Sequence, residues 1–125
     1  MPELKTPQDS TPYPRDPKSR PAVPPLPDGN FVYVQDQVGV IWILPDGPHR
    51  HPRVLGNALP ARYAGDLRVL HGRIHDVTNL SGTFQYDERD GLLEVAAELR
   101  RVGFEVEPGA VRFFPQDGSR PEILE

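Results

Sequence analysis

The chain has 125 residues, which is enough for one domain and too few for two. Its formal charge is −4 and it has no Lys/Arg-rich run, which argues against a domain built around duplex DNA or RNA. Because it has no cysteine, disulfides, thiolate nucleophiles and Cys-ligated zinc are excluded. The longest apolar stretch, 38–44, is too short to span a membrane, and the N-terminus lacks the pattern of a secretory signal. We therefore expect a soluble protein, either cytoplasmic or delivered by a route without a signal peptide.

The prolines divide the chain into two parts. Of 16 prolines, nine lie in residues 1–30, where no apolar run is longer than two residues. Such a segment buries too little surface to offset the entropy lost on ordering it, so residues 1–29 are predicted to be a disordered Pro-rich leader. The leader would act as a stiff spacer or as a docking peptide for an aromatic groove. Residues 30–125 are predicted to form a single α+β domain.

Two strands are predicted at the start of this domain. Residues 31–35 alternate large apolar residues with β-branched ones, and residues 40–44 are apolar on both faces, as in a central strand. The turn-forming residues 36–39 between them predict a β-hairpin. The segment 49–62 that follows shows no obvious secondary structure. Because long ordered loops are often functional, it is the first place to expect a site.

A second hairpin is predicted after this loop. Residues 66–70 and 73–79 flank a His-Gly pair that suits a tight turn. In this register Val69 faces Ile74. The apolar residues that follow are out of phase with Ile74, which predicts a bulge near His75.

The C-terminal part is predicted to hold the main helix and the last strands. A short strand is expected at 84–86, and Asp87 is a suitable N-cap for a helix that ends before Gly103. One apolar stripe of this helix contains Leu92, Val95, Ala96, Leu99 and Val102. Two strands are expected at 104–106 and 110–114. The predicted fold is α+β in the order β-β-loop-β-β-α-β-β, a small curved antiparallel sheet of about six short strands with one helix on one face.

The candidate chemistry centres on the histidines of the loop. His49 and His51 are spaced so that an extended segment would present both to a metal, as a metal-dependent hydrolase would need. His51 and Ser81 are also a candidate base and nucleophile, with Asp66 or Asp76 as the orienting group. The alternative is that the loop histidines are exposed or bonded to backbone, and that Ser81 satisfies backbone groups at a bulge.

Arginines and glycines near the same loop favour an anionic ligand. Arg53, Arg62 and His51 are predicted to hold it, and Gly56 and Gly65 would let backbone N–H groups approach it. Neither the phosphate-loop nor the dinucleotide-binding glycine pattern occurs, so no cofactor is named.

Three short stretches form an ordered series: His51-Pro52-Arg53-Val54-Leu55-Gly56, Tyr63-Ala64-Gly65-Asp66-Leu67 and Asn79-Leu80-Ser81-Gly82-Thr83-Phe84. The series resembles a domain associated with plant calmodulin-binding IQ-motif proteins and with bacterial secreted effectors or polymorphic toxins. The family pattern resembles His-Ser-Ser followed by Leu and Gly, then Ala-Gly-Glu opening a hairpin, then Asn-x-Ser-Gly-His-Tyr closing it. Here 52–53 replace the serines, Asp66 replaces the glutamate, and 83–84 replace the His-Tyr pair, so one of two family histidines is missing. The resemblance covers about 51–106 and implies a type of module; no IQ motif is present.

The leading hypothesis is a small bacterial toxin or effector module. Its site would lie in the 49–62 loop facing 79–81, and it would act on a nucleotide-like anionic ligand. The predicted catalytic residues are His51 and Ser81, and the predicted ligand-binding residues are Arg53, Arg62, Tyr63, Gly65 and Asn79. The alternatives are a non-catalytic interaction domain that binds a partner protein, including an immunity-type binder, and the metal-dependent hydrolase.

Overall fold

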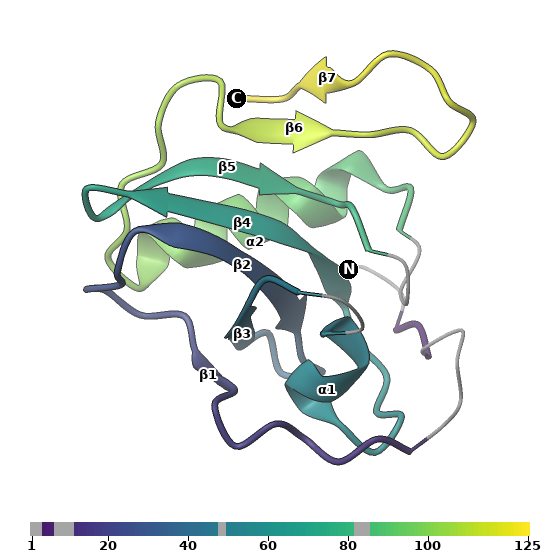
Figure 1. The fold of residues 1–125 in the computed structure, drawn as a ribbon. Coiled ribbons are helices and arrows are strands. Elements are labelled where there is room, and N and C mark those ends of the chain that lie inside the picture. The colour runs from purple at the N-terminus through teal and green to yellow at the C-terminus, as the bar shows by residue number, and fades with distance from the viewer. Residues whose placement is uncertain (1–3, 7–11, 48–49, 82–85) are drawn as a thin grey trace.

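The computed structural model describes residues 4–6, 12–47, 50–81 and 86–125. These residues form an α+β fold, in which one open sheet of seven strands has a helix packed against it. The elements are β1 (Arg20–Pro21), β2 (Gly29–Gln35), β3 (Ile41–Pro45), α1 (His51–Leu55), β4 (Tyr63–Leu70), β5 (Arg73–Thr78), α2 (Arg89–Arg101), β6 (Val111–Phe113) and β7 (Glu122–Ile123). Their order in the sheet is β1-β3-β2-β4-β5-β6-β7. Figure 1 shows α2 behind the sheet and the shorter α1 in front of it. The predicted fold class is confirmed, with seven strands in place of about six.

Both predicted hairpins are present. β2 and β3 pair antiparallel, and Asp36 holds their turn because its Oδ1 accepts hydrogen bonds from the backbone N–H groups of Val38 and Val40. In the second hairpin Val69 pairs with Ile74, as predicted. The register shifts beside this pair and leaves His75 as the extra residue of β5, which confirms the predicted bulge.

The main helix buries the predicted stripe but begins later than expected. Leu92, Val95, Ala96 and Leu99 are buried, and Val102 packs against the same core. The prediction that Asp87 is the N-cap is wrong: α2 begins at Arg89, and Glu88 occupies the N-cap position without a capping side-chain bond. The carboxylate of Asp87 accepts a hydrogen bond from the backbone N–H of Gln116 instead. A tertiary partner thus takes the side chain that local propensity assigned to the helix.

The segments after α2 pair differently from the prediction. β6 runs parallel to β5, because α2 carries the chain back to start again in the same direction. The predicted strand at 104–106 is wrong: Val106 makes only a single parallel bridge, to Ile74. The outer neighbour of β6 is β7, a strand that the sequence did not predict. The predicted strand at 84–86 falls mostly on 82–85, which lie outside the described residues.

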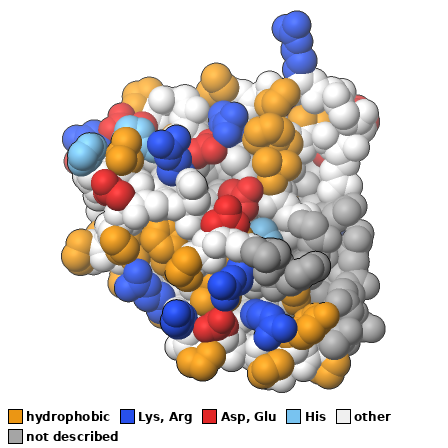
Figure 2. Space-filling model, in the orientation of Figure 1, with side chains coloured by type: hydrophobic (Ala, Val, Ile, Leu, Met, Phe, Trp, Pro, Cys, Tyr) orange, Lys and Arg blue, Asp and Glu red, His pale blue; other side chains and the backbone are white. Residues whose placement is uncertain are grey.

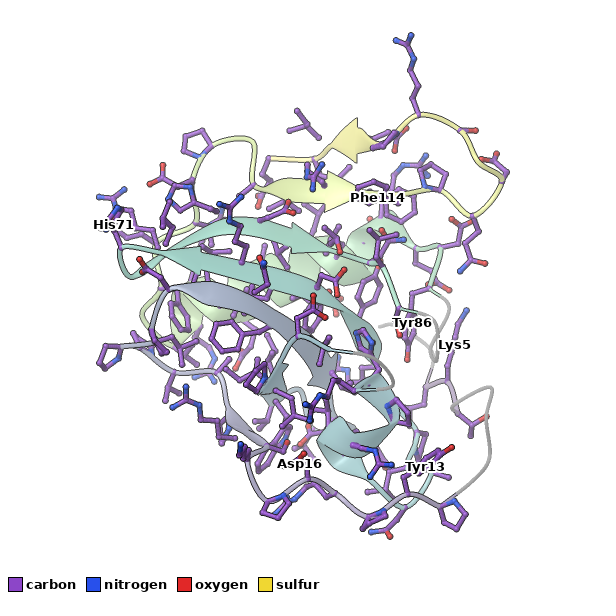
Figure 3. All side chains as sticks on the ribbon, viewed as in Figure 1. Lys5, Tyr13, Asp16, His71, Tyr86 and Phe114 are labelled. Atoms are coloured by element: carbon purple, nitrogen blue, oxygen red, sulfur yellow. The ribbon has the colours of Figure 1, made fainter. Side chains whose placement is uncertain are left out.

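The leader was expected to be disordered, but its described residues pack on the domain. β1 pairs antiparallel with β3, and Ala22 and Leu26 are buried in the core. Figure 3 shows Tyr13 and Asp16 along the lower edge of the molecule, on the side where α1 lies. Proline restricts the backbone before folding, so an extended leader loses less entropy on docking than its composition alone indicates.

The two faces of the sheet differ in cover. Side chains alternate along each strand, so Tyr63, Gly65, Leu67 and Val69 of β4 face α2. On the other side, α1 and the leader cover the β2–β3 half of the sheet. We call the opposite half of that side, on β4, β5 and β6, the open face; among the described residues no helix or strand covers it. Figure 2 views this side of the molecule.

Candidate functional site

The predicted loop 49–62 contains a helix that sequence patterns do not reveal. α1 begins at His51, and Pro52 fits there because the first N–H groups of a helix have no intrahelical partner. Val54 is fully buried, and α1 contacts β2 and β3. Gly56, at φ +74°, follows the last residue of the helix. This packing fixes His51 against the sheet.

His51 is held by one backbone group of β4. Its Nε2 lies 2.8 Å from the carbonyl oxygen of Gly65. Because a carbonyl only accepts, Nε2 carries the hydrogen, and in the neutral ring Nδ1 is the acceptor. Burial lowers the pKa of His51, against smaller raising effects of the Gly65 hydrogen bond and the charge of Asp46. The ring is therefore neutral at pH 7.

Asp66 follows Gly65 in β4 and points to the open face. Burial raises the pKa of Asp66 to about 6, and the charges of Asp46 and Asp76 add to this effect. Arg112 neutralises Asp76 through two hydrogen bonds of 2.6 Å each. No cation within the described part of the chain pairs with Asp66. Figure 2 shows acidic side chains beside a histidine near the centre of this face.

The two arginines predicted to hold an anion lie in separate contacts. The guanidinium of Arg53 sits over the ring of Tyr13, 4.8 Å from its centroid. Arg62 extends toward α2, where its Nη2 is 3.7 Å from Glu94. Since His51 bonds to β4, the structure does not bring these three residues to one ligand.

Tyr63 and Asn79 act as links between segments. Tyr63 donates a hydrogen bond of 2.8 Å to the carbonyl of Glu88 and stacks on Tyr86. Burial raises the pKa of the Tyr63 phenol. Asn79 is buried; its amide donates to the carbonyls of Tyr86 and Phe114, and its oxygen accepts from the N–H of Phe114. Both side chains are engaged in holding the backbone.

Gly65 is required by a close approach of two strands. A Cβ atom at this position would lie 1.8 Å from the carbonyl oxygen of Thr78 and 3.0 Å from the ring of Tyr33. Its smallness serves the packing of β4 against its neighbours, and its carbonyl positions His51.

Ser81 lies apart from His51. It is half-buried and lines a pocket of about 240 Å³ together with Asn79, Leu80 and Phe114. Figure 3 labels Phe114, which follows β6. His51 is not among the described residues that line this pocket, so the predicted base and nucleophile have different surroundings.

Sequence reasoning missed one buried polar residue, Gln35. It ends β2, is 3% exposed, and lines a pocket of about 490 Å³ that also contains Arg62. The available signal was its alternation with Phe31 and Tyr33, which places an amide on the buried side of the strand.

The remaining predictions meet three findings. His49, one of the two proposed metal ligands, lies outside the described residues; within the described ones, no group of three or more His, Asp or Glu side chains is placed to hold a metal. No helix in the described ranges has the length and apolar character needed to cross a bilayer. Comparison of the chain with family models, curated proteins and solved structures finds no significant match. The resemblance to the effector domain therefore stays a prediction.

Proposed function

We propose that this chain is a non-catalytic protein-interaction domain, and that the open face receives a Lys or Arg side chain of a partner at Asp46 and Asp66. The observation that carries the proposal is the half-buried Asp66 carboxylate, which turns toward the open face and pairs with no cation of the described chain. A buried carboxylate without a partner is unfavourable, and a cation supplied by another protein would relieve that cost.

The surroundings of Asp66 support a cationic partner. Asp46 adds a second negative charge, whereas Asp76 is already neutralised by Arg112. The whole chain carries a formal charge of −4, which would steer a basic partner toward it. Arg112 also lies over the ring of Phe114, so an aromatic surface borders the charged one.

A titration with a short Lys/Arg-rich peptide, followed by two-dimensional NMR, tests this function. We expect amide shifts in β4 and β5 on the open face, and an affinity at least about fivefold lower for Asp66→Asn, the effect of one close charge pair. Asp90→Asn is the matched control, because Asp90 is an exposed acidic residue on α2. Equal weakening by both substitutions, or shifts spread over all surfaces, would mean nonspecific attraction and contradict the proposal.

A toxin-type enzyme is the second candidate, and one observation favours it. Asp46 acts on two groups whose pKa values are displaced toward each other: that of His51 is lowered, and that of Asp66 is raised to about 6. Opposed shifts in neighbouring acids and bases are typical of general acid–base sites. Against a nucleotide-like substrate, Arg53 and Arg62 are committed elsewhere, and the carboxylates would repel phosphate.

Expression in a bacterial cytoplasm separates the two candidates. The interaction domain predicts equal growth with the wild type and His51→Ala. Growth arrest by the wild type that His51→Ala relieves, and that the exposed-turn control His71→Ala does not relieve, would establish the enzyme and overturn the proposed function.

A further inference from the structure

The largest hollow described above lies on the α2 side of the sheet, away from the open face. It has a volume of about 490 Å³ and lies between the β2–β3 turn and α2. Val38, Val40 and Ala97 supply its apolar wall, and Gln35 and Arg62 supply polar groups from the sheet side. Glu94 stands on the helix side of the same pocket.

The polar groups of this pocket include two buried atoms without partners. The Nε2 of Gln35 donates to the carbonyl of Gly39 at 3.1 Å, which fixes the amide orientation because a carbonyl only accepts. The Oε1 atom is therefore the free one, and it has no hydrogen-bond partner among the described residues. The same holds for Nε of Arg62, whose side chain is 18% exposed. Buried donors and acceptors are rarely left unpaired, so each instance calls for a reason.

The turn makes room for the arginine. A Cβ on Gly39 would lie 3.2 Å from Nη1 of Arg62, so the glycine lets the guanidinium lie against the backbone. The contact of Arg62 with Glu94 is long, at 3.7 Å, and Glu94 is 44% exposed on its side chain. The guanidinium thus keeps the capacity to bind a planar anion through two N–H groups.

The charges define the class of ligand. Glu98 and Arg101 at the rim neutralise each other through bonds of 2.7 and 2.6 Å. Inside, one cation, Arg62, faces one anion, Glu94, with the Gln35 acceptor beside them. A ligand that fits this arrangement carries a carboxylate for Arg62 and an ammonium for Gln35 and Glu94.

We propose that this pocket binds a free α-amino acid with a small apolar side chain. Arg62 would bind the α-carboxylate, the Oε1 of Gln35 and the carboxylate of Glu94 would accept from the α-ammonium, and Val40 and Ala97 would contact the side chain. The net charge of the pocket is zero, which matches a zwitterion. The site is separate from Asp66 and does not depend on the interaction function proposed above.

An NMR titration with L-valine tests the proposal. We expect saturable shifts of the Gln35 side-chain amide and of the Arg62 Nε–H signal. N-acetyl-L-valine and L-valine amide, which lack the ammonium and the carboxylate respectively, should bind at least about tenfold more weakly. Binding of either blocked compound as tight as that of L-valine would overturn the zwitterion assignment.

Two variants and a control complete the test. Arg62→Gln should lower the affinity for L-valine at least about tenfold, whereas Arg100→Gln, which removes an exposed cation of α2 outside the pocket, should not. Gln35→Met keeps the size of the side chain and removes the free acceptor, so it should also lower the affinity while the fold is retained. No saturation of the wild type by about 10 mM L-valine, or unchanged affinity of both variants, would overturn the site.

Discussion

Gly65 shows how a single residue can be fixed by its neighbours. We expect Gly65→Ala to destabilise the protein by more than about 3 kcal/mol, because the new Cβ would lie 1.8 Å from the carbonyl oxygen of Thr78 and the strand backbone would have to move. Urea unfolding measures the change. Gly72→Ala is the control: nothing lies within 4 Å of its Cβ, and its positive φ should cost about 1 kcal/mol. Similar losses for both would contradict the steric argument.

Asp66 carries a stability cost that depends on pH. Its folded pKa of about 6 exceeds the ordinary value of 3.8, so the folded protein binds this proton more tightly than the unfolded chain. The contribution of Asp66 is therefore most favourable at low pH and declines as the pH rises from about 4 through about 6.

Replacement of Asp66 by a neutral residue should remove this cost. We expect Asp66→Asn to raise the free energy of unfolding at pH 7 by about 1–2 kcal/mol, a value reduced for partial solvent exposure, and to leave it unchanged at pH 4. Urea unfolding at both pH values checks this expectation. The same gain at pH 4 would mean that packing, and not charge, is responsible.

The candidate site was predictable only in part from residue patterns. The histidine of the 49–62 loop does lie at the sheet, beside Gly65, as the series of motifs predicted. The ligands of Arg53 and Arg62 were not predictable, because one arginine stacks on Tyr13 and the other reaches α2. Both contacts join positions far apart in the chain, and no local pattern encodes them.

At the scale of elements, Asn79 ties the end of β5 to the end of β6. We expect Asn79→Ala to cost about 2–4 kcal/mol, because it removes hydrogen bonds of 2.9, 2.9 and 2.7 Å to the carbonyls of Tyr86 and Phe114 and the N–H of Phe114. Urea unfolding is the measurement, and Asn30→Ala at an exposed position of β2 is the control. A loss no greater than that of Asn30→Ala would show that the link contributes little.

The elements that sequence patterns revealed are those with local determinants. The two hairpins follow from alternation and turn residues, and α2 follows from an apolar stripe. α1 has only five residues, too few for a helical period to stand out. The parallel pairing of β6 and the presence of β7 depend on contacts made after the chain has returned over α2, so neither could be predicted from local sequence.

For the whole molecule, the main departure from expectation is the packed leader. We expect Leu26→Ala to lower the free energy of unfolding by about 2–3 kcal/mol, because Leu26 is 6% exposed. Val23→Ala is the control within the leader: Val23 is 49% exposed and should change stability by less than about 0.5 kcal/mol. Unfolding can be followed by the fluorescence of Trp42, the single tryptophan. A negligible effect of Leu26→Ala would show that the leader does not pack on the domain in solution.

The short strand β1 has a consequence for self-association. It occupies one edge of the sheet with two residues, one of which is proline, and β7 occupies the other edge with two. Edges this short offer few free backbone groups to another chain. If β1 were detached, β3 would become the edge, and its sequence Ile-Trp-Ile-Leu-Pro would expose an apolar template for intermolecular pairing. The Pro-rich leader thereby acts as a guard against aggregation.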